Sequence, residues 1–223
     1  MSCELDHLFV CTAAGAPEAG RLIEFGLTEG TPNTHPGQGT ANRRFFFHNA
    51  FLELLWVHNP QEAQSEAIRP LHLWERWSGR GKETCPFGFI FRPAGQEPGG
   101  PPFPTWEYRP SYLPEPLSIE VGTNADTLTE PMLFYMAFGR RTDVRLRGQP
   151  QPREHSAGGR EITRLHFGSP HADELSAELR ATVDSGLVSF GAGETYLLEI
   201  GFDGESQGRS ADFRPALPLV FRW

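Results

Sequence analysis

Leu5-Asp6-His7-Leu8-Phe9-Val10 and Phe51-Leu52-Glu53-Leu54-Leu55-Trp56-Val57 are the two runs from which the architecture of this chain can be inferred. Both combine β-branched or aromatic residues with turn residues on either side, which predicts two β-strands. Each run carries a polar residue near its centre, His7 in the first and Glu53 in the second. Because such a side chain is costly to bury without a partner, two that meet in space indicate a site.

The residues around these runs give the order of the first sixty positions. Side chains alternate across a strand, so within residues 4–11 the side chains of Leu5, His7 and Phe9 are expected to share one face. Pro17 and Gly26 bound a short helix. Residues 42–48 and 51–57 then form a hairpin across a short turn. The predicted order is strand, helix, polar loop, strand and strand.

The last sixty residues repeat this pattern without repeating its residues. A strand at 162–167 precedes a helix that begins near Ser169-Pro170 and ends at Gly186. Three further strands are predicted at 187–190, 196–202 and 217–223. We therefore divide this α+β chain into a first module at 1–60, a connecting region with extra strands and a Pro-rich loop at 61–160, and a second module at 161–223.

The connecting region contains 8 prolines in the 24 positions 93–116. Proline lacks the backbone N–H that helices and central strands need, so neither is expected there. Two interpretations are open. The segment is a surface loop whose aromatic residues pack on the core, or it is a lid or wall over a ligand pocket.

Composition narrows the range of partners. The net charge of −8 argues against a nucleic-acid partner, and no stretch approaches the length of apolar chain that spans a bilayer. Cys3, Cys11 and Cys85 form no paired motif and are expected to be free thiols. The start of the chain is acidic and lacks the pattern of a signal peptide. We predict a cytoplasmic protein without a membrane partner.

The order strand, helix and three strands, opening with Leu5-Asp6-His7-Leu8-Phe9-Val10, resembles the vicinal oxygen chelate superfamily. That superfamily includes glyoxalase I, extradiol dioxygenases, and fosfomycin- and bleomycin-resistance proteins. The motifs His35-Pro36-Gly37, Gly39-Thr40-Ala41-Asn42-Arg43 and Phe51-Leu52-Glu53-Leu54 look like its glyoxalase-like branch. The resemblance implies paired βαβββ modules that form an open, funnel-like barrel of mixed sheet. Such modules pair within a chain or between chains, which leaves a homodimer open.

The resemblance also implies a metal site. In this superfamily the ligands lie on the first and last strands of each module, which here implies His7 and Glu53 from the first module. His166 and Glu199 are the counterparts in the second module. Imidazole and carboxylate ligands suit a divalent ion such as zinc, nickel, iron or manganese. Glu53 or Glu199 would then serve as the general base.

One departure from the family pattern leaves a second ligand set open. Glu199 lies on the second predicted strand after its helix, whereas Glu53 lies on the third. If Glu199 is not a ligand, His7, His166 and Glu53 remain as a set of two histidines and one carboxylate, which is typical of iron(II) or manganese sites. A histidine satisfied by a neighbouring protein group, without metal, is the structural alternative.

The implied function is that of a glyoxalase-like lyase, isomerase or dioxygenase acting on a small oxygenated metabolite. Strand alternation places either Arg43 or Arg44 inside the barrel, where it can bind a substrate carboxylate or pair with Glu53. The sequence has no Gly-rich phosphate loop, so no nucleotide cofactor is expected. Two alternatives remain. One is a non-enzymatic protein that sequesters a small molecule, and the other is a scaffold whose cleft is filled by the Pro-rich segment.

Overall fold

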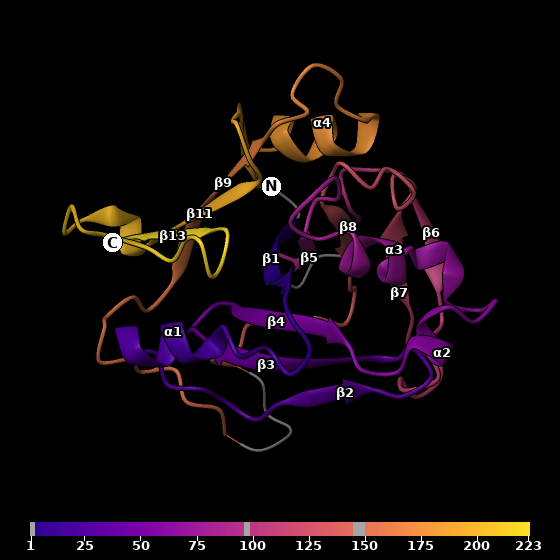
Figure 1. The fold of residues 1–223 in the computed structure, drawn as a ribbon, viewed down its shortest axis with the longest axis horizontal. Coiled ribbons are helices and arrows are strands. Elements are labelled where there is room, and N and C mark those ends of the chain that lie inside the picture. Colours follow the sequence, from indigo (N-terminus) through magenta and orange to yellow (C-terminus); the bar gives the residue numbers. More distant parts are fainter. Residues whose placement is uncertain (1–2, 96–98, 145–149) are drawn as a thin grey trace.

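The computed structural model describes residues 3–95, 99–144 and 150–223, and its strands form two mixed sheets (Figure 1). The larger sheet has eight strands in the order β2-β3-β4-β1-β5-β8-β7-β6. Their bounds are β1 (Cys3–Cys11), β2 (Asn33–His35), β3 (Thr40–Phe46), β4 (Phe51–Val57), β5 (Phe87–Pro93), β6 (Thr105–Tyr108), β7 (Ile119–Gly122) and β8 (Met132–Tyr135). This sheet curls into an open half-barrel, so the predicted α+β class and open sheet are confirmed.

The first half of the larger sheet is the predicted βαβββ unit. Helix α1 (Ala19–Phe25) follows β1, and Gly26 ends the helix in the left-handed conformation that glycine adopts without strain. The hairpin of β3 and β4 follows, and β4 returns to pair with β1 in parallel. The fold thereby places the two runs that carry His7 and Glu53 side by side.

The second half of the larger sheet lies at residues 87–135, and not at 161–223 as the sequence indicated. β5 pairs with β1 in the antiparallel sense and with β8 in parallel, as β1 pairs with β4. In the described residues between β5 and β6 there is no helix. The Pro-rich segment occupies that part of the chain, and its prolines disfavour the helix by which a module is recognised in a sequence.

Residues 162–222 form a separate five-stranded sheet in the order β10-β9-β11-β13-β12. Its elements are β9 (Ile162–Ser169), α4 (Ala177–Asp184), β10 (Ser189–Ala192), β11 (Leu197–Phe202), β12 (Ser210–Asp212) and β13 (Leu219–Arg222). The predicted order of strand, helix and strands is present, but the connections differ. β9 pairs in parallel with the strand that follows its helix, whereas β1 pairs in parallel with the last strand of its module.

The core between the two sheets is rich in aromatic rings. Phe47 of the first half meets Phe202 of β11 at 4.8 Å between ring centroids, and Phe25 of α1 meets Trp223 at 5.4 Å. Large buried rings contribute about 2–3 kcal/mol each by burial. The smaller sheet therefore covers the outer face of the half-barrel and leaves its concave face to a second apolar cluster, which includes Phe9, Leu55 and Phe134.

A β-bulge changes the predicted face of one residue. Leu5 pairs with Phe91 and His7 with Ile90, so Asp6 is an extra residue in β1. A bulge reverses the alternation of side chains beyond it. Leu5 accordingly packs against the core between the sheets, and the prediction that it shares a face with His7 is wrong.

Three short helical segments follow β4: α2 (Pro60–Ala63), the 3-10 turn η1 (Arg69–Leu71) and α3 (Leu73–Ser78). A further 3-10 turn, η2 (Asp203–Glu205), follows β11 in the smaller sheet. In the Pro-rich segment, β6 is an edge strand of the larger sheet, where proline is tolerated. Of its prolines, Pro98 lies outside the described residues. No helix of the described chain is long and apolar enough to cross a membrane.

Gly88 of β5 provides a test of packing in the half-barrel. A Cβ at this position would lie 2.1 Å from a ring carbon of Phe9. We expect Gly88→Ala to lower the free energy of unfolding by about 1–3 kcal/mol through overpacking, measured by urea denaturation. Gly20→Ala in α1 is the control, since it meets nothing within 4 Å and should leave stability unchanged or raised. Equal stability of the Gly88→Ala and wild-type proteins would contradict this account of β5.

Glu199 of β11 provides a test of pH dependence. Its carboxylate accepts hydrogen bonds from Arg222 at 2.7 and 3.1 Å, and these bonds hold the pKa of Glu199 below its ordinary value. The pair therefore stabilises the fold above the pKa of Glu199 in the unfolded chain, and this stabilisation is lost as the pH falls through the lower folded value. We expect Glu199→Gln to cost up to about 1 kcal/mol at pH 7 and less in acid, measured by denaturation at several pH values.

The control is Glu194→Gln, because Glu194 is exposed. It should leave the stability of the protein unchanged across the same pH range. A deficit of the Glu199→Gln variant that stays constant from pH 7 to acid would show that the ion pair is not its cause.

Candidate functional site

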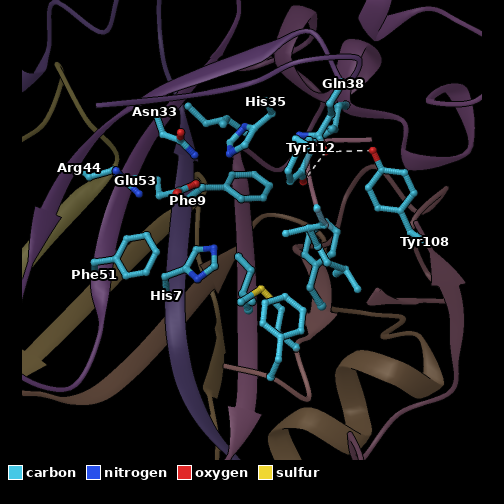
Figure 2. A pocket seen from close by; sticks show the side chains of 18 residues that line it. His7, Phe9, Asn33, His35, Gln38, Arg44, Phe51, Glu53, Tyr108 and Tyr112 are labelled. Atoms are coloured by element: carbon cyan, nitrogen blue, oxygen red, sulfur yellow. Dashed lines mark hydrogen bonds between the residues drawn. The ribbon is translucent and has the colours of Figure 1, made fainter. Parts of the chain in front are cut away.

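The concave face of the half-barrel contains a cavity of about 300 Å³ (Figure 2). This volume is at the lower end of the range for small-molecule sites. Residues of both halves of the larger sheet and of the connecting region line it: His7, Phe9, Asn33, His35, Gln38, Arg44, Phe51, Glu53, Leu55, Leu73, Ile90, Tyr108, Tyr112, Leu113, Ile119, Phe134, Met136 and Phe138.

The structure brings His7 and Glu53 to this one cavity. The parallel pairing of β1 with β4 sets His7 opposite Phe51 and Phe9 opposite Glu53, so the side chains of both strands face the same side. The imidazole of His7 stacks on the ring of Phe51, with 4.3 Å between centroids and 12° between planes. In Figure 2 these side chains stand on one side of the cavity.

Among the described side chains, the buried amide of Asn42 is the hydrogen-bond partner of Glu53. Its side chain is 6% exposed, and its Oε1 accepts a hydrogen bond of 2.7 Å from Nδ2 of the buried Asn42. Asn42 itself is fixed by the neighbouring strand, because its Oδ1 accepts from the backbone N–H of Asn33. The second carboxylate oxygen of Glu53 is the one available to a ligand in the cavity.

His7 is oriented by the residue at the bulge. Its Nδ1 lies 2.7 Å from Oδ1 of Asp6, a side chain that is 0% exposed. Behind Asp6, the buried guanidinium of Arg92 approaches at 3.5 Å and also bonds Glu4 and the carbonyl of Asn49. Since Nδ1 is occupied, Nε2 is the ring nitrogen that His7 can offer to a ligand.

A chain of polar groups leads to a second imidazole, that of His35 on β2. The hydroxyls of Tyr108 and Tyr112 donate to Oε1 of Gln38 at 3.3 and 3.1 Å. Nε2 of Gln38 donates to Oγ1 of Thr40 at 2.7 Å, and Thr40 lies 2.8 Å from Nδ1 of His35. Burial lowers the pKa of His35, so this imidazole is neutral at physiological pH.

The opposite wall of the cavity is apolar. Ile90 of β5 is paired directly across from His7, and Phe134 of β8 is paired with Ile90. Met136 and Phe138, which follow β8, and Leu113 of the Pro-rich segment extend this wall. Apart from Tyr108 of β6, the half of the sheet that should complete a chelate site therefore presents apolar side chains at the cavity.

His166 and Glu199 lie in the five-stranded sheet, away from this cavity. They are cross-strand neighbours, His166 on β9 and Glu199 on β11. Their partners are different, however. Nδ1 of His166 lies 3.0 Å from Oγ of Ser189, and Glu199 pairs with Arg222 and Arg164. The structure does not bring them to His7 and Glu53.

The residues present do not fit either expected metal-ligand set. Both sets need His166, and one also needs Glu199. Within residues 3–95, 99–144 and 150–223, no group of three or more His, Cys, Asp or Glu side chains is arranged to hold a metal ion. His7 and Glu53 are the two expected ligands that lie at the cavity.

The two arginines separate as strand alternation predicted. Arg43 faces away from the cavity, where its guanidinium bonds both carboxylate oxygens of Glu29 at 2.7 and 2.5 Å. Arg44 lines the cavity, donates from Nε to the carbonyl of Thr31 at 2.8 Å, and lies over the ring of Phe46. Arg44 is thus the arginine of this pair that a ligand can reach.

Sequence reasoning missed several residues of the site. His35 and Asn42 stood in the family-like motifs but received no role, and Asp6 received none although it precedes His7. Gln38 and Tyr112 carry no signal that a single sequence could reveal, because their contact joins positions 74 residues apart.

Comparison with known proteins agrees with this architecture. The model of a family described as a glyoxalase-like domain matches residues 5–183. A solved structure, a hypothetical protein from Staphylococcus aureus, is similar over 99% of both chains with a TM-score of 0.52, at 12% identity, and this likeness concerns the fold alone. No curated protein matches the chain. The family match covers most of the chain, which therefore belongs to the glyoxalase-like domain family, within the vicinal oxygen chelate superfamily.

Proposed function

We propose that this protein is a glyoxalase-like lyase or isomerase that binds a small oxygenated metabolite in the cavity of the half-barrel. The proposal rests on the burial and the hydrogen bonding of Glu53. This carboxylate is almost fully buried at the polar side of the cavity, and Asn42 holds one of its oxygens. Among the described residues no hydrogen-bond donor holds the other oxygen, which can therefore bind a ligand.

The arrangement suits proton transfer. A carboxylate positioned by one hydrogen bond can accept a proton from a carbon or hydroxyl group held against it. The apolar wall of Ile90, Phe134 and Met136 can hold the body of the substrate and exclude water from the reacting atoms. Glu53 is therefore the proposed general base, and Arg44 the proposed contact for an anionic oxygen.

The family implies a divalent metal, which would polarise the oxygens of the substrate when bound. Because the expected ligand sets are incomplete at this cavity, no step of the proposed mechanism depends on that ion. The proposal rests on the orientation of Glu53 and His7 by their protein neighbours.

Sequestration of a small molecule is the second candidate function. It is supported by the apolar and aromatic majority of the lining residues. The scaffold alternative has less support, because Tyr112 and Leu113 of the Pro-rich segment form a wall of the cavity and leave its volume open.

Glu53→Gln tests the proposed chemistry. The wild-type protein and the variant are incubated with a pool of small carbonyl and hydroxy compounds, and mass spectrometry measures which are bound and which are consumed. We expect the wild-type protein to consume a compound, and the variant to lose at least about a hundredfold in rate, as is usual when a general base is removed. Glu194→Gln, an exposed matched change, should behave as the wild type.

Each other outcome of this experiment has a clear meaning. If the wild-type protein binds a compound but does not consume it, the enzymatic function is contradicted and sequestration of a small molecule is supported. Consumption that is equally fast with Glu53→Gln would remove Glu53 as the base. Absence of both binding and consumption across the pool would contradict the cavity as a ligand site for this class of compound.

Metal analysis tests the incomplete ligand set. We expect protein purified without an affinity tag or chelator to contain clearly less than one equivalent of zinc, nickel, iron or manganese, because two protein donors hold such ions weakly. One equivalent that is lost in both His7→Ala and Glu53→Ala would contradict this expectation and would place a metal at the cavity.

A further inference from the structure

We infer that residues 151–160 form a strap that docks on the half-barrel at neutral pH and is released when His155 gains a second proton. This segment leads toward β9 and, in Figure 1, passes beside α1 on its way there. None of residues 151–160 lines the cavity, so the release of the strap does not depend on the proposed function. The effect of that release on ligand binding, through Arg44, does rest on the proposed function.

Backbone groups of two different segments hold both nitrogens of the His155 ring. The N–H of Thr28, in the loop after α1, donates to Nδ1 at 3.0 Å. Nε2 lies 3.0 Å from the carbonyl oxygen of Phe46 on β3. A backbone N–H can only donate and a carbonyl oxygen can only accept, so these partners fix the proton of the ring on Nε2. The docked strap therefore requires the neutral form of His155.

A second proton on His155 does not fit this arrangement. It would be added to Nδ1 and would face the N–H of Thr28, so that two donors would oppose each other. The ring is partly buried and meets Phe47 edge-on at 5.0 Å between centroids, and its burial lowers the pKa of His155. In a released strap the ring is in water, where the pKa of histidine is about 6.5. Docking is therefore favoured above this pH and weakens as the pH falls below it.

The charged groups around His155 act in opposite directions. Glu154, the preceding residue, favours the charged ring, whereas His48, which follows β3, disfavours it. These two residues also bond each other, with 2.8 Å between Nε2 of His48 and Oε1 of Glu154, so a proton on His48 strengthens their contact. In the loop after α1, the carboxylate of Glu29 is held by Arg43. Protonation of His48 thus favours the docked strap, and protonation of His155 favours its release.

The other hydrogen bonds between the strap and the loop after α1 are exposed. Oγ of Ser156 donates to the carbonyl of Gly26 at 3.1 Å, and Oγ1 of Thr28 donates to the carbonyl of Glu154 at 3.4 Å. Water can replace the partners of such bonds, so each contributes little to docking. His155 also connects the strap to the aromatic core, and its charge state therefore has a large effect on docking.

The strap reaches the wall of the cavity through Thr31. Oε1 of Gln151 accepts from the N–H of Thr31 at 2.9 Å, and Nε2 of Gln151 donates to its Oγ1 at 3.3 Å. The carbonyl of Thr31 accepts from Nε of Arg44, which lines the cavity. Phe46, whose carbonyl accepts from His155, lies under the guanidinium of Arg44. Release of the strap therefore loosens the groups that position Arg44.

Hydrogen exchange of the Thr28 amide tests the release in the wild-type protein. It is measured by NMR from pH 8 to pH 5 and expressed as a protection factor, which removes the intrinsic effect of pH on exchange. One proton changes an equilibrium at most about tenfold per pH unit, and we expect the protection of Thr28 to fall about tenfold over this range. The protection of Leu27, whose N–H bonds the carbonyl of Leu22 in α1, should stay constant. The Nε–H signal of Arg44 should shift over the same pH range as Thr28.

His155→Gln removes the titration and keeps a donor for the carbonyl of Phe46. In this variant the protection of Thr28 and the signal of Arg44 should no longer depend on pH. His48→Gln, which removes the opposing histidine, should keep or enlarge the fall in protection. His171→Gln is the matched control at an exposed position and should behave as the wild type.

Three results would overturn the release of the strap. They are constant protection of Thr28 in the wild-type protein, an equal fall in His155→Gln, and an ordinary pKa for the ring of His155, which its own NMR signals measure without any variant. If Thr28 loses protection while the Arg44 signal stays unchanged, the coupling to the cavity is wrong. If both respond and no compound binds in the cavity, the strap is supported and the proposed function is contradicted.

Discussion

The antiparallel pairing of β1 with β5 is the contact on which the rest of the structure depends. It joins the two halves of the larger sheet, and it sets His7 of one half beside Ile90 of the other. The same pairing contains the bulge at Asp6. A regular ladder would turn Asp6 and His7 to opposite faces, whereas the extra residue lets the Asp6 carboxylate reach the imidazole. The pairing that joins the two halves of the sheet therefore also orients the imidazole of His7 at the cavity.

The two halves of the larger sheet differ in chemistry although their strand orders correspond. The first half presents His7, His35 and Glu53 to the cavity, and the second half presents Ile90 and Phe134. Each polar group of the first half is fixed from behind by a protein neighbour: Asp6, Thr40 or Asn42. A site built in this way can orient a ligand that has one polar end and one apolar end, because each end meets a surface of its own kind.

The sequence predicted the first module well because its signals are local. Strand alternation, the Gly26 cap and the short turn before Phe51 all act within a few residues, and together they place His7 and Glu53 on paired strands. The second module could not be found in this way. The described residues between β5 and β6 contain no helix, whereas residues 162–222 carry the full pattern of strands and helix but use it in a different sheet.

Local sequence signals also fail to predict which face of a sheet some side chains occupy. Leu5 was misplaced because a bulge depends on the partner strand, which is 86 residues away for the contact of Leu5 with Phe91. His166 and Glu199 were assigned by pattern to a site from which the topology separates them. Local sequence signals thus predict which side chains share a strand, and long-range pairing decides which strands share a cavity.

The Pro-rich segment links the topology of the second half to the cavity of the first. A helix at this position would bury its own backbone groups, but the segment instead turns Tyr112 toward Gln38 on the β2–β3 turn and Leu113 toward the cavity. The hydroxyl of Tyr112 begins the chain of hydrogen bonds through Gln38 and Thr40 that ends at His35. The segment that stands where the first half has a helix thereby both walls the cavity and orients one of its polar groups. Its irregular backbone brings Tyr112 and Leu113 to the site, where a helix packed on the outer face of the sheet would not reach.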